Sequence, residues 1–237
     1  MRFGMHQSRK TVLITGANRG IGLGLVSKFL AHGHTVIATA RNPDGARDLW
    51  EFEHTYPGRC RILALDVTDD RSISSFADSL KGQAIDVLIN NAGYLATPSG
   101  GFADLSEAAL IKSFGINTLG PVKVTQALLH NLQAAAAPLL VVISSKMGSL
   151  TDNTGGSYYA YRMSKVALNM FVRSFAVDFP DITAVTLHPG WVKTDMGGEM
   201  APTTVEESTT GLFRVIEQMK PIDSGRFIDF HGDDIAW

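Results

Sequence analysis

The sequence predicts an α/β fold: a single-domain Rossmann fold with a doubly wound, mostly parallel seven-stranded sheet flanked by helices. Short apolar runs alternate with longer segments of helical period along the 237 residues. The apolar runs are uniformly hydrophobic, which is typical of parallel strands that are covered on both faces. No shift in composition marks a second domain, so we expect one domain over residues 10–237 and a disordered or loose leader over residues 1–9.

Seven apolar runs give the expected strands in chain order: 11–16, 34–40, 60–67, 85–93, 139–145, 182–190 and 226–230. Helices are expected at 22–33, 69–82 and 159–179. In the first of these helices, Leu23, Val26 and Leu30 recur at helical spacing, and Gly33 follows as a stop signal. Ligands of doubly wound sheets bind beyond the carboxyl ends of the strands. The residues that follow each apolar run are therefore the candidates for function.

The composition argues against several classes of function. The formal net charge is −2, so the electrostatic footprint of a nucleic-acid-binding protein is missing. The one cysteine, Cys60, excludes an internal disulfide and paired-cysteine metal sites, and we expect no metal site elsewhere. No window approaches the roughly 18 apolar residues that a membrane span needs. We therefore expect a soluble, cytoplasmic protein without nucleic-acid or membrane partners.

The first apolar run ends in TGANRGIG, in which Gly16, Gly20 and Gly22 lie between an expected strand and an expected helix. Glycines there permit a tight turn and let the backbone approach a pyrophosphate at the helix N-terminus. The spacing differs from the G-x-G-x-x-G fingerprint. A simple strand-to-helix turn is the alternative, but three glycines in the first βα unit favour a phosphate-binding turn.

The end of the second strand indicates which dinucleotide would bind. An NAD site usually carries an acidic residue about 20 residues after the glycine turn, where it holds the ribose 2′-hydroxyl. Here Ala40 and Arg41 occupy that region, and no acid follows until Asp44. A guanidinium is a good partner for a 2′-phosphate, and Arg19 would add a second positive charge. The sequence therefore favours NADP(H) over NAD(H), the alternative being that both arginines are solvated surface charges.

Asp66 follows the third apolar run, at the place where an adenine ring would lie. The same carboxylate is also near the start of the next helix, although Thr68 and Asp69 are better placed to cap it. Spacing alone leaves both roles open.

Five motifs occur in a fixed order: TGANRGIG, NNAG at residues 90–93, a serine after the fifth run, a tyrosine four residues before a lysine, and PG after the sixth run. In this combination the sequence resembles the classical short-chain dehydrogenase/reductases from about Thr11 onward. ISSKMGS, YYAYRMSK, HPGWVKTDMGG and FIDFHGDDIAW are similar to the branch that holds Sniffer-type carbonyl reductases and C-factor proteins. The resemblance implies NADPH-linked reduction of a small-molecule carbonyl (aldehyde, ketone or quinone), or a signalling role with little catalysis. It also implies a homodimer or homotetramer.

Three of the five tyrosines closely precede Lys165: Tyr158, Tyr159 and Tyr161. On a helix, Tyr161 lies one turn from Lys165, and Tyr158, seven residues before the lysine, shares roughly that face. Spacing therefore leaves Tyr158 and Tyr161 open. The resemblance favours Tyr161, since the divergent enoyl reductases that use the earlier tyrosine lack the glycine turn, NNAG and the catalytic serine. We then expect Tyr158 at the wall of the cleft and Tyr159 in packing.

The tyrosine–lysine pair has a chemical reason. A free phenol has a pKa of about 10 and is a poor acid or base at neutral pH. A lysine ammonium one turn away, with the charge of the cofactor nearby, favours the phenolate, so we expect the pKa of Tyr161 to be lowered. Tyr161 would then give its proton to the substrate oxygen as general acid. The resemblance implies that Lys165 also holds the ribose hydroxyls next to the nicotinamide.

The fifth run ends in Ser144 and Ser145, with Ser149 as a more distant candidate. Adjacent strand side chains point to opposite faces, so only one of the first two is expected to act. The resemblance selects Ser145, whose hydroxyl would bind the carbonyl oxygen and stabilise the developing negative charge. It also makes Asn117, which otherwise reads as an ordinary polar helix residue, the holder of a water linked to the lysine.

The remaining expected site residues follow from the resemblance and from their places after the strands. The expected cofactor-binding residues are Gly16, Asn18, Arg19, Gly20, Ile21, Gly22, Arg41, Asp66, Val67, Asn91, Ala92, Gly93, Tyr161, Lys165, Pro189, Gly190, Val192 and Thr194. The expected substrate-lining residues are Tyr94, Met147, Tyr158, Trp191 and Met196. They suggest a small or apolar carbonyl compound, with specificity in residues 94–101 and 195–209. His188 is expected to be structural.

Overall fold

The computed structural model describes residues 9–95 and 101–237. Its sheet has seven strands in the order β3-β2-β1-β4-β5-β6-β7, and every neighbouring pair is parallel. The strands are β1 (Thr11–Ile14), β2 (Thr35–Ala40), β3 (Cys60–Ala64), β4 (Val87–Asn90), β5 (Leu139–Ile143), β6 (Thr183–His188) and β7 (Phe227–Asp229). The order reverses direction at β1, next to β4, as in a doubly wound sheet. The predicted fold class is confirmed.

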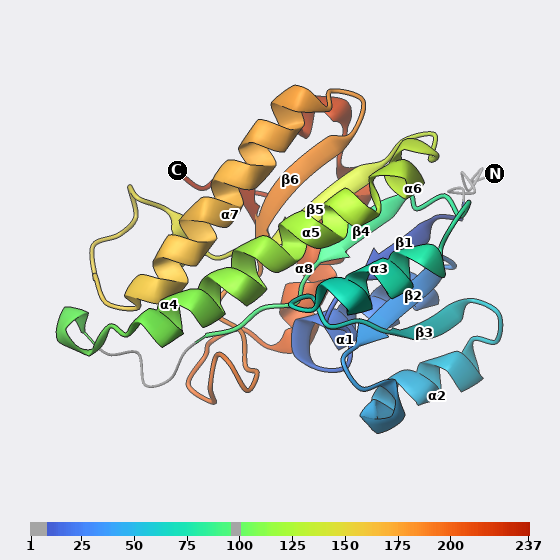
Figure 1. The fold of residues 1–237 in the computed structure, drawn as a ribbon, viewed down its shortest axis with the longest axis horizontal. Helices are drawn as coiled ribbons and strands as arrows, with labels where there is room; N and C mark the ends of the chain where they lie inside the picture. The colour runs from blue at the N-terminus through green and yellow to red at the C-terminus, as the bar shows by residue number, and fades with distance from the viewer. Residues whose placement is uncertain (1–8, 96–100) are drawn as a thin grey trace, which may run out of the picture.

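Strand alternation divides the core into two layers. Val12 and Ile14 of β1 face one layer, whereas Leu13 between them faces the other. The first layer is covered by α1 (Gly20–Ala31), α2 (Arg47–Thr55) and α8 (Val205–Gln218). The second is covered by α3 (Asp70–Asp78), α5 (Gly120–Ala127), α6 (Leu129–Gln133) and α7 (Tyr159–Asp178). In Figure 1, α3, α5 and α7 cross in front of the sheet and α8 lies behind it.

One long helical segment is interrupted by a π-helical turn. It consists of α4 (Glu107–Phe114), the π-helix η3 (Gly115–Leu119) and α5. The extra residue of such a turn shifts the phase of the side chains that follow it, and π-turns are frequent at functional sites. The shorter 3₁₀ turns are η1 (Pro43–Gly45), η2 (Phe102–Asp104), η4 (Lys146–Gly148) and η5 (Pro221–Asp223).

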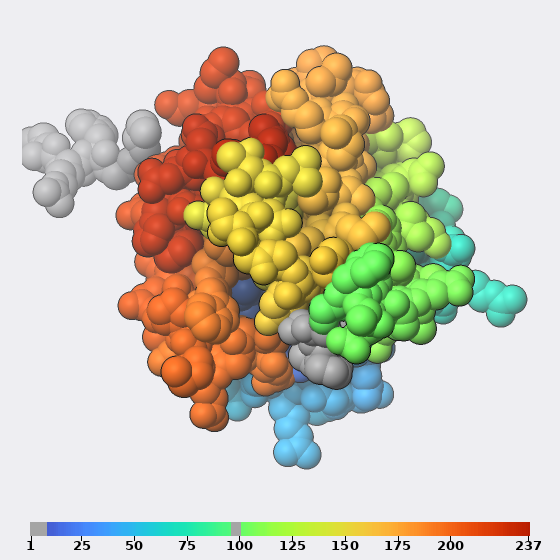
Figure 2. Space-filling model, turned by 90° about the vertical axis from the view of Figure 1, so that its left-hand side faces the viewer, coloured from blue at the N-terminus to red at the C-terminus, as the bar shows by residue number. Residues whose placement is uncertain are grey.

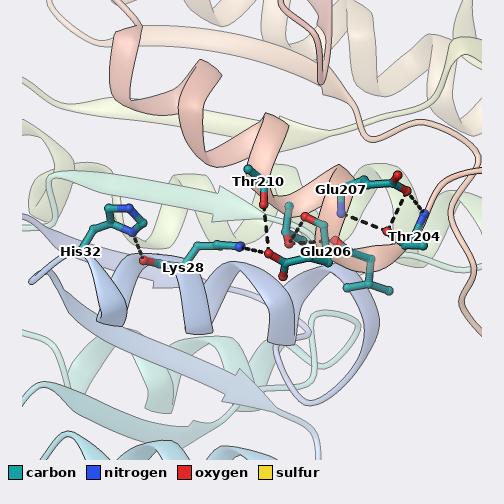
Figure 3. Close-up of polar contacts among 8 residues, drawn as sticks. Lys28, His32, Thr204, Glu206, Glu207 and Thr210 are labelled. Carbon is teal, nitrogen blue, oxygen red and sulfur yellow. Dashed lines mark hydrogen bonds and ion pairs between the residues drawn. The ribbon is translucent and has the colours of Figure 1, made fainter.

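Helices α1 and α8 pack closely at Gly24. A Cβ atom on Gly24 would lie 2.8 Å from the Cγ2 atom of Thr209, so only glycine permits this approach. The ammonium of Lys28 pairs with the carboxylate of Glu206 across the two helices (Figure 3). Figure 3 also shows the capping box that starts α8: Thr204 Oγ1 accepts from the Glu207 amide at 3.1 Å, and the Glu207 carboxylate accepts from the Thr204 amide at 2.8 Å.

Two of the expected segments lie wholly or partly outside the described residues. The expected loose leader lies outside the described residues except for Arg9, and so do residues 96–100 of the expected specificity loop. Within the described ranges, none of the helices combines the length and apolarity that crossing a membrane requires. The same ranges hold no group of three His, Cys, Asp or Glu side chains that could bind a metal ion.

Candidate active site

The segments that follow the strands gather on one face of the molecule, which Figure 2 shows. The orange segment after β6, the yellow segment before α7 and the green region of α4 surround a hollow. Blue atoms from the N-terminal part of the chain are visible inside it (Figure 2). This is the place where a doubly wound sheet binds its ligand.

The glycine turn is held in place by the end of β4. The Thr15 hydroxyl accepts from the amides of Asn91 and Ala92, each at 3.0 Å. The Asn91 amide group donates to the carbonyls of Thr15 (2.9 Å) and Gly16 (3.0 Å). Gly16 has φ +62°, and a Cβ there would lie 2.9 Å from the Ala92 Cα atom, so both backbone conformation and space require glycine. NNAG therefore fixes the shape of the turn.

The N-terminus of α1 opens from this turn without a side-chain cap. Arg19 is its N-cap residue, but its side chain makes no capping hydrogen bond, and no acidic residue lies in the first turn. Its first amides are thus available to an anion. Asn18 is exposed and Ile21 is partly buried against the core. The predicted phosphate-binding turn has the geometry that role needs.

The segment after β6 covers the start of α1. A Cβ atom on Gly20 would lie 3.2 Å from the Thr194 Cγ2 atom, and the Arg19 guanidinium pairs with the Asp195 carboxylate. The sequence does not predict this pair. Arg19 is expected to add a charge for the 2′-phosphate, but here the guanidinium already has an anionic partner. Both side chains are largely exposed, so a phosphate can compete with Asp195 for the arginine.

Arg41 and Asp66 face each other at the ends of β2 and β3. Arg41 is exposed, and its charge contributes to lowering the pKa of Asp66. The main cause of that lowered pKa is the hydrogen bond from the Thr68 hydroxyl, at 2.7 Å. Asp69, rather than Asp66, caps α3 by accepting from the Arg71 amide at 2.9 Å. The capping alternative for Asp66 is thereby removed.

Val67 lies behind this corner. It is buried, and Gly120 of α5 packs directly against it, with a Cβ there only 2.9 Å from the Val67 Cγ2 atom. Its side chain therefore belongs to the packing between β3 and α5, and any contact with a dinucleotide would come from its backbone.

Tyr161 and Lys165 lie one turn apart on α7, as the spacing predicts. The Lys165 ammonium is buried, donates to the Ile143 carbonyl at 2.9 Å and lies 5.6 Å from the centre of the Tyr161 ring. It also comes close to Gly93, whose Cβ would be 3.9 Å from Nζ. The lysine thus joins the ends of β4 and β5 to the tyrosine.

The pKa values of this pair differ from what the sequence predicts. Burial raises the pKa of Tyr161 to about 12, and a hydrogen bond with Ser145 only partly offsets it. Burial also lowers the pKa of Lys165 to about 8. The expected lowering of the tyrosine pKa by the lysine is therefore wrong for the protein by itself, because the site penalises phenolate and ammonium alike.

The three candidate serines differ in the groups that they contact. Ser144 is buried and donates to the Asn169 side chain at 2.7 Å, and Ser149 is buried with its Oγ atom accepting from the Asp152 amide at 3.0 Å. Ser145 lies close enough to Tyr161 for its hydroxyl to lower the pKa of the phenol, and its Oγ atom accepts from the Met147 amide at 3.2 Å. Of the three, Ser145 is the one that shares the site with the tyrosine.

Asn117 lies in the π-helix and is completely buried. Its Oδ1 atom accepts from the Tyr94 amide at 2.7 Å, and its Nδ2 atom donates to the Tyr94 carbonyl at 2.8 Å and to the Ser164 hydroxyl at 3.0 Å. The side chain therefore holds the loop after β4 beside α7, and its role in holding a water stays a prediction.

Tyr158 differs from its expected orientation. It is the N-cap of α7 in the left-handed conformation (φ 53°, ψ 34°), so it lies outside the helix and does not share the face of Tyr161. The spacing argument that kept it as a rival extended the helical period one residue beyond the expected start of the helix at residue 159, which is where α7 begins. Tyr159 packs edge-to-face on Phe102, with the ring centres 5.5 Å apart, as expected of a packing residue.

The segment after β6 is anchored to α8 and β7. The Pro189 carbonyl accepts from the buried Ser208 hydroxyl at 2.6 Å, and Gly190 lies against Phe230. Val192 pairs with Thr203 in an isolated bridge. His188 has a pKa lowered to about 4 by burial, which keeps its ring neutral at physiological pH and fits the structural role predicted for it.

The expected substrate-lining residues differ in their exposure. Tyr94 and Met147 are partly buried, whereas Trp191 and Met196 are exposed, and the Trp191 indole donates to the Gly197 carbonyl at 2.8 Å. Lys112 lies 4.2 Å from the centre of the Tyr94 ring and was not expected there. Nothing in its spacing distinguishes it from a solvated charge on α4.

Comparison with known proteins agrees with the fold and the motifs. Residues 10–204 match the family described as short chain dehydrogenase. The C-signal of Myxococcus xanthus is 45% identical over 165 residues, which are 69% of this chain and 99% of that protein. The NADPH-bound carbonyl reductase from chicken fatty liver is 37% identical with a TM-score of 0.92, over 98% of this chain and 100% of that one. The carbonyl reductase Sniffer of D. melanogaster is 34% identical with a TM-score of 0.92, over 97% and 100% of the two chains.

Proposed function

Because the chain belongs to the short chain dehydrogenase family, we propose that it is an NADPH-dependent oxidoreductase that reduces a carbonyl compound to an alcohol, with Tyr161 as proton donor. The family prediction is confirmed. The observation that carries the finer proposal is the meeting of Ser145, Tyr161 and Lys165 at one point beside the glycine turn. The substrate would be an aldehyde, ketone or quinone. The two carbonyl reductases with a TM-score of 0.92 support this class.

The residues present fit a dinucleotide. The uncapped start of α1 would bind the pyrophosphate through its backbone amides. In the part of the chain that the structure describes, Lys165 donates to one acceptor, the Ile143 carbonyl, which leaves N–H donors for ribose hydroxyls. Arg41 would pair with the 2′-phosphate and Asp66 would lie near the adenine. On this proposal, residues 10–237 form one NADP-binding domain, and the protein works in the cytoplasm.

The chemistry follows from the protonation of the site. NADPH, when bound, supplies the hydride. The Ser145 hydroxyl donates to the substrate oxygen and stabilises its developing negative charge. The Tyr161 phenol then gives that oxygen its proton, which it holds at neutral pH because its pKa is about 12. The Lys165 Nζ atom lies 5.6 Å from the ring centre, and with the cofactor bound its ammonium would favour the phenolate that remains.

Tyr161→Phe tests this role directly. The variant keeps the ring and loses only the hydroxyl, so we expect NADPH oxidation with a panel of aldehydes, ketones and quinones to fall by about 100-fold or more. Tyr158→Phe is the matched control and should lose far less, since Tyr158 lies outside the helix. Equal rates for wild type and Tyr161→Phe across the panel would remove the enzyme proposal.

A second function has one observation in its favour. The 45% identity with the C-signal supports a signalling protein that binds NADP(H) and catalyses little. Such a protein would bind NADPH as tightly as an enzyme but would not oxidise it with any carbonyl in the panel. Binding without turnover would therefore favour this second function over the first.

A further inference from the structure

The backbone immediately before α7 is strained. Gly156, Ser157 and Tyr158 all have positive φ angles, of 60°, 54° and 53°. Only glycine adopts this region without cost, and a bulky tyrosine there is uncommon. Such strain persists only where the surrounding structure imposes it. The turn ends three residues before Tyr161, so whatever holds it also holds the start of the helix that carries the phenol.

One side chain supplies most of that hold. The Arg162 Nε atom donates to the carbonyls of Gly156, at 2.9 Å, and Ser157, at 3.2 Å. Its Nη1 atom donates to the Met147 carbonyl at 3.3 Å. A planar guanidinium presents its N–H donors in a fixed fork that reaches carbonyls of two segments, whereas a lysine ammonium donates from a single point.

These three carbonyls belong to the two segments that bear the reacting hydroxyls. Met147 lies in η4, the turn that Ser145 caps through its own Oγ atom. The strained turn leads directly into α7 and Tyr161. A little farther along, Gly148 packs against Lys165, with a Cβ there only 3.0 Å from the Lys165 Cβ atom. Arg162 therefore spans the gap between the serine segment and the tyrosine segment.

The guanidinium has no other evident purpose. It is partly buried, and none of the ion pairs among the described residues includes it. All its hydrogen bonds in those residues go to backbone carbonyls. We infer that Arg162 is a positioning residue whose fork ties the left-handed turn to η4 and so sets the separation between the Ser145 hydroxyl and the Tyr161 phenol. The inference rests on the proposed function of that pair.

Arg162→Lys is the decisive variant, because it keeps the charge and most of the volume but loses the fork. Misplacement of a reacting group by about 1 Å can cost about 100-fold in rate, so we expect kcat to fall roughly tenfold while KM stays within about threefold. Amide hydrogen exchange in residues 156–162 should become faster, a readout that does not depend on turnover. Arg173→Met, which removes a cation from an exposed part of the same helix, is the control and should match wild type.

A second change separates positioning from a general structural role. Ser157→Gly removes the steric cost of the left-handed conformation, so in the Arg162→Lys background it should restore part of the lost kcat. If Arg162→Lys keeps kcat within threefold of wild type, or if Ser157→Gly restores nothing, the inference is overturned. Tyr161→Phe is assayed in parallel: full activity in that variant sinks the proposed function instead.

Discussion

At the scale of single residues, the site holds two ionisable groups, and burial disfavours the charged form of each. Burial raises the pKa of Tyr161 to about 12 and lowers that of Lys165 to about 8. Among the described residues, the Ile143 carbonyl is the only acceptor to which the Lys165 ammonium donates. A buried cation with one neutral partner lowers the stability of the fold, and this is the kind of cost that functional sites commonly carry.

We therefore predict that Lys165→Met stabilises the protein at neutral pH. The folded pKa of Lys165, about 8, lies below its unfolded value of 10.5, so below pH 8 the folded state bears the full cost of the buried charge. That cost is on the order of 3 kcal/mol. The Ile143 carbonyl is left unpaired in the variant, which destabilises the variant by about 1 kcal/mol. The variant should thus be about 2 kcal/mol more stable at pH 7.

The stability advantage of Lys165→Met should depend on pH. As pH rises from 8 to 10.5, the folded wild type loses the lysine proton before the unfolded chain does, so wild type gains stability and the advantage of Lys165→Met shrinks. Urea unfolding of both proteins at pH 7 and pH 10 measures the difference. A variant less stable than wild type at pH 7 would contradict the burial cost on which the prediction rests.

The identity of most site residues could be predicted from sequence, but their electrostatics could not. Spacing placed Tyr161 one turn from Lys165, and the structure agrees. The predicted direction of the shift in the Tyr161 pKa was wrong. The shift is caused by burial, which depends on the packing of β4, β5 and α7 and cannot be predicted from a four-residue spacing. Arg162 was missed for a similar reason, since its carbonyl partners are backbone atoms that the sequence cannot show.

At the scale of elements, the starts of strands and helices were both predicted to within two residues, whereas the predicted strand ends extend up to three residues too far. Each strand begins within one or two residues of its apolar run, because a buried parallel strand needs an apolar side chain on both faces. The start of α7 proved decisive for Tyr158, which the helical period placed on the wrong face. The period continues across the boundary, whereas the backbone turns left-handed there, held by the hydrogen bonds of Arg162 and by the Asn153 side chain, which accepts from the Gly156 amide at 3.1 Å.

The capping box of α8 provides a prediction at this scale. Thr204→Ala removes the hydroxyl that accepts from the Glu207 amide, and loss of an N-cap typically costs about 1 kcal/mol. For a chain of this size that corresponds to a fall of roughly 2–4 °C in Tm. Thr210→Ala, on the exposed side of the same helix, is the control and should shift Tm by less than about 1 °C. Equal shifts in a thermal melt of the two variants would contradict the capping role.

At the scale of the whole molecule, the strand order explains why distant motifs meet. With β1 between β2 and β4, the turn after β1 lies beside Arg41 after β2 and beside NNAG after β4. The next two strands bring Ser145 and the segment after β6 to the same edge. This convergence was predictable from the alternation of strands and helices. The cover of Thr194 and Asp195 over the glycine turn was not, because it depends on how the segment folds back from β6.

The proposed cofactor makes a prediction about the stability of the entire fold. A ligand that binds only the folded state at 100 times its Kd stabilises it by about 2.7 kcal/mol, or roughly 5–10 °C in Tm for a chain of this length. We expect NADPH to produce such a shift and NADH at the same concentration to produce much less, since the 2′-phosphate would pair with Arg41. In Arg41→Ala the NADPH shift should fall to that of NADH, while Arg61→Ala, an exposed arginine on edge strand β3, should keep the difference. Arg41→Ala weakening both dinucleotides equally would mean that the guanidinium does not distinguish them, and the preference for NADP(H) would have to come from elsewhere on the turn.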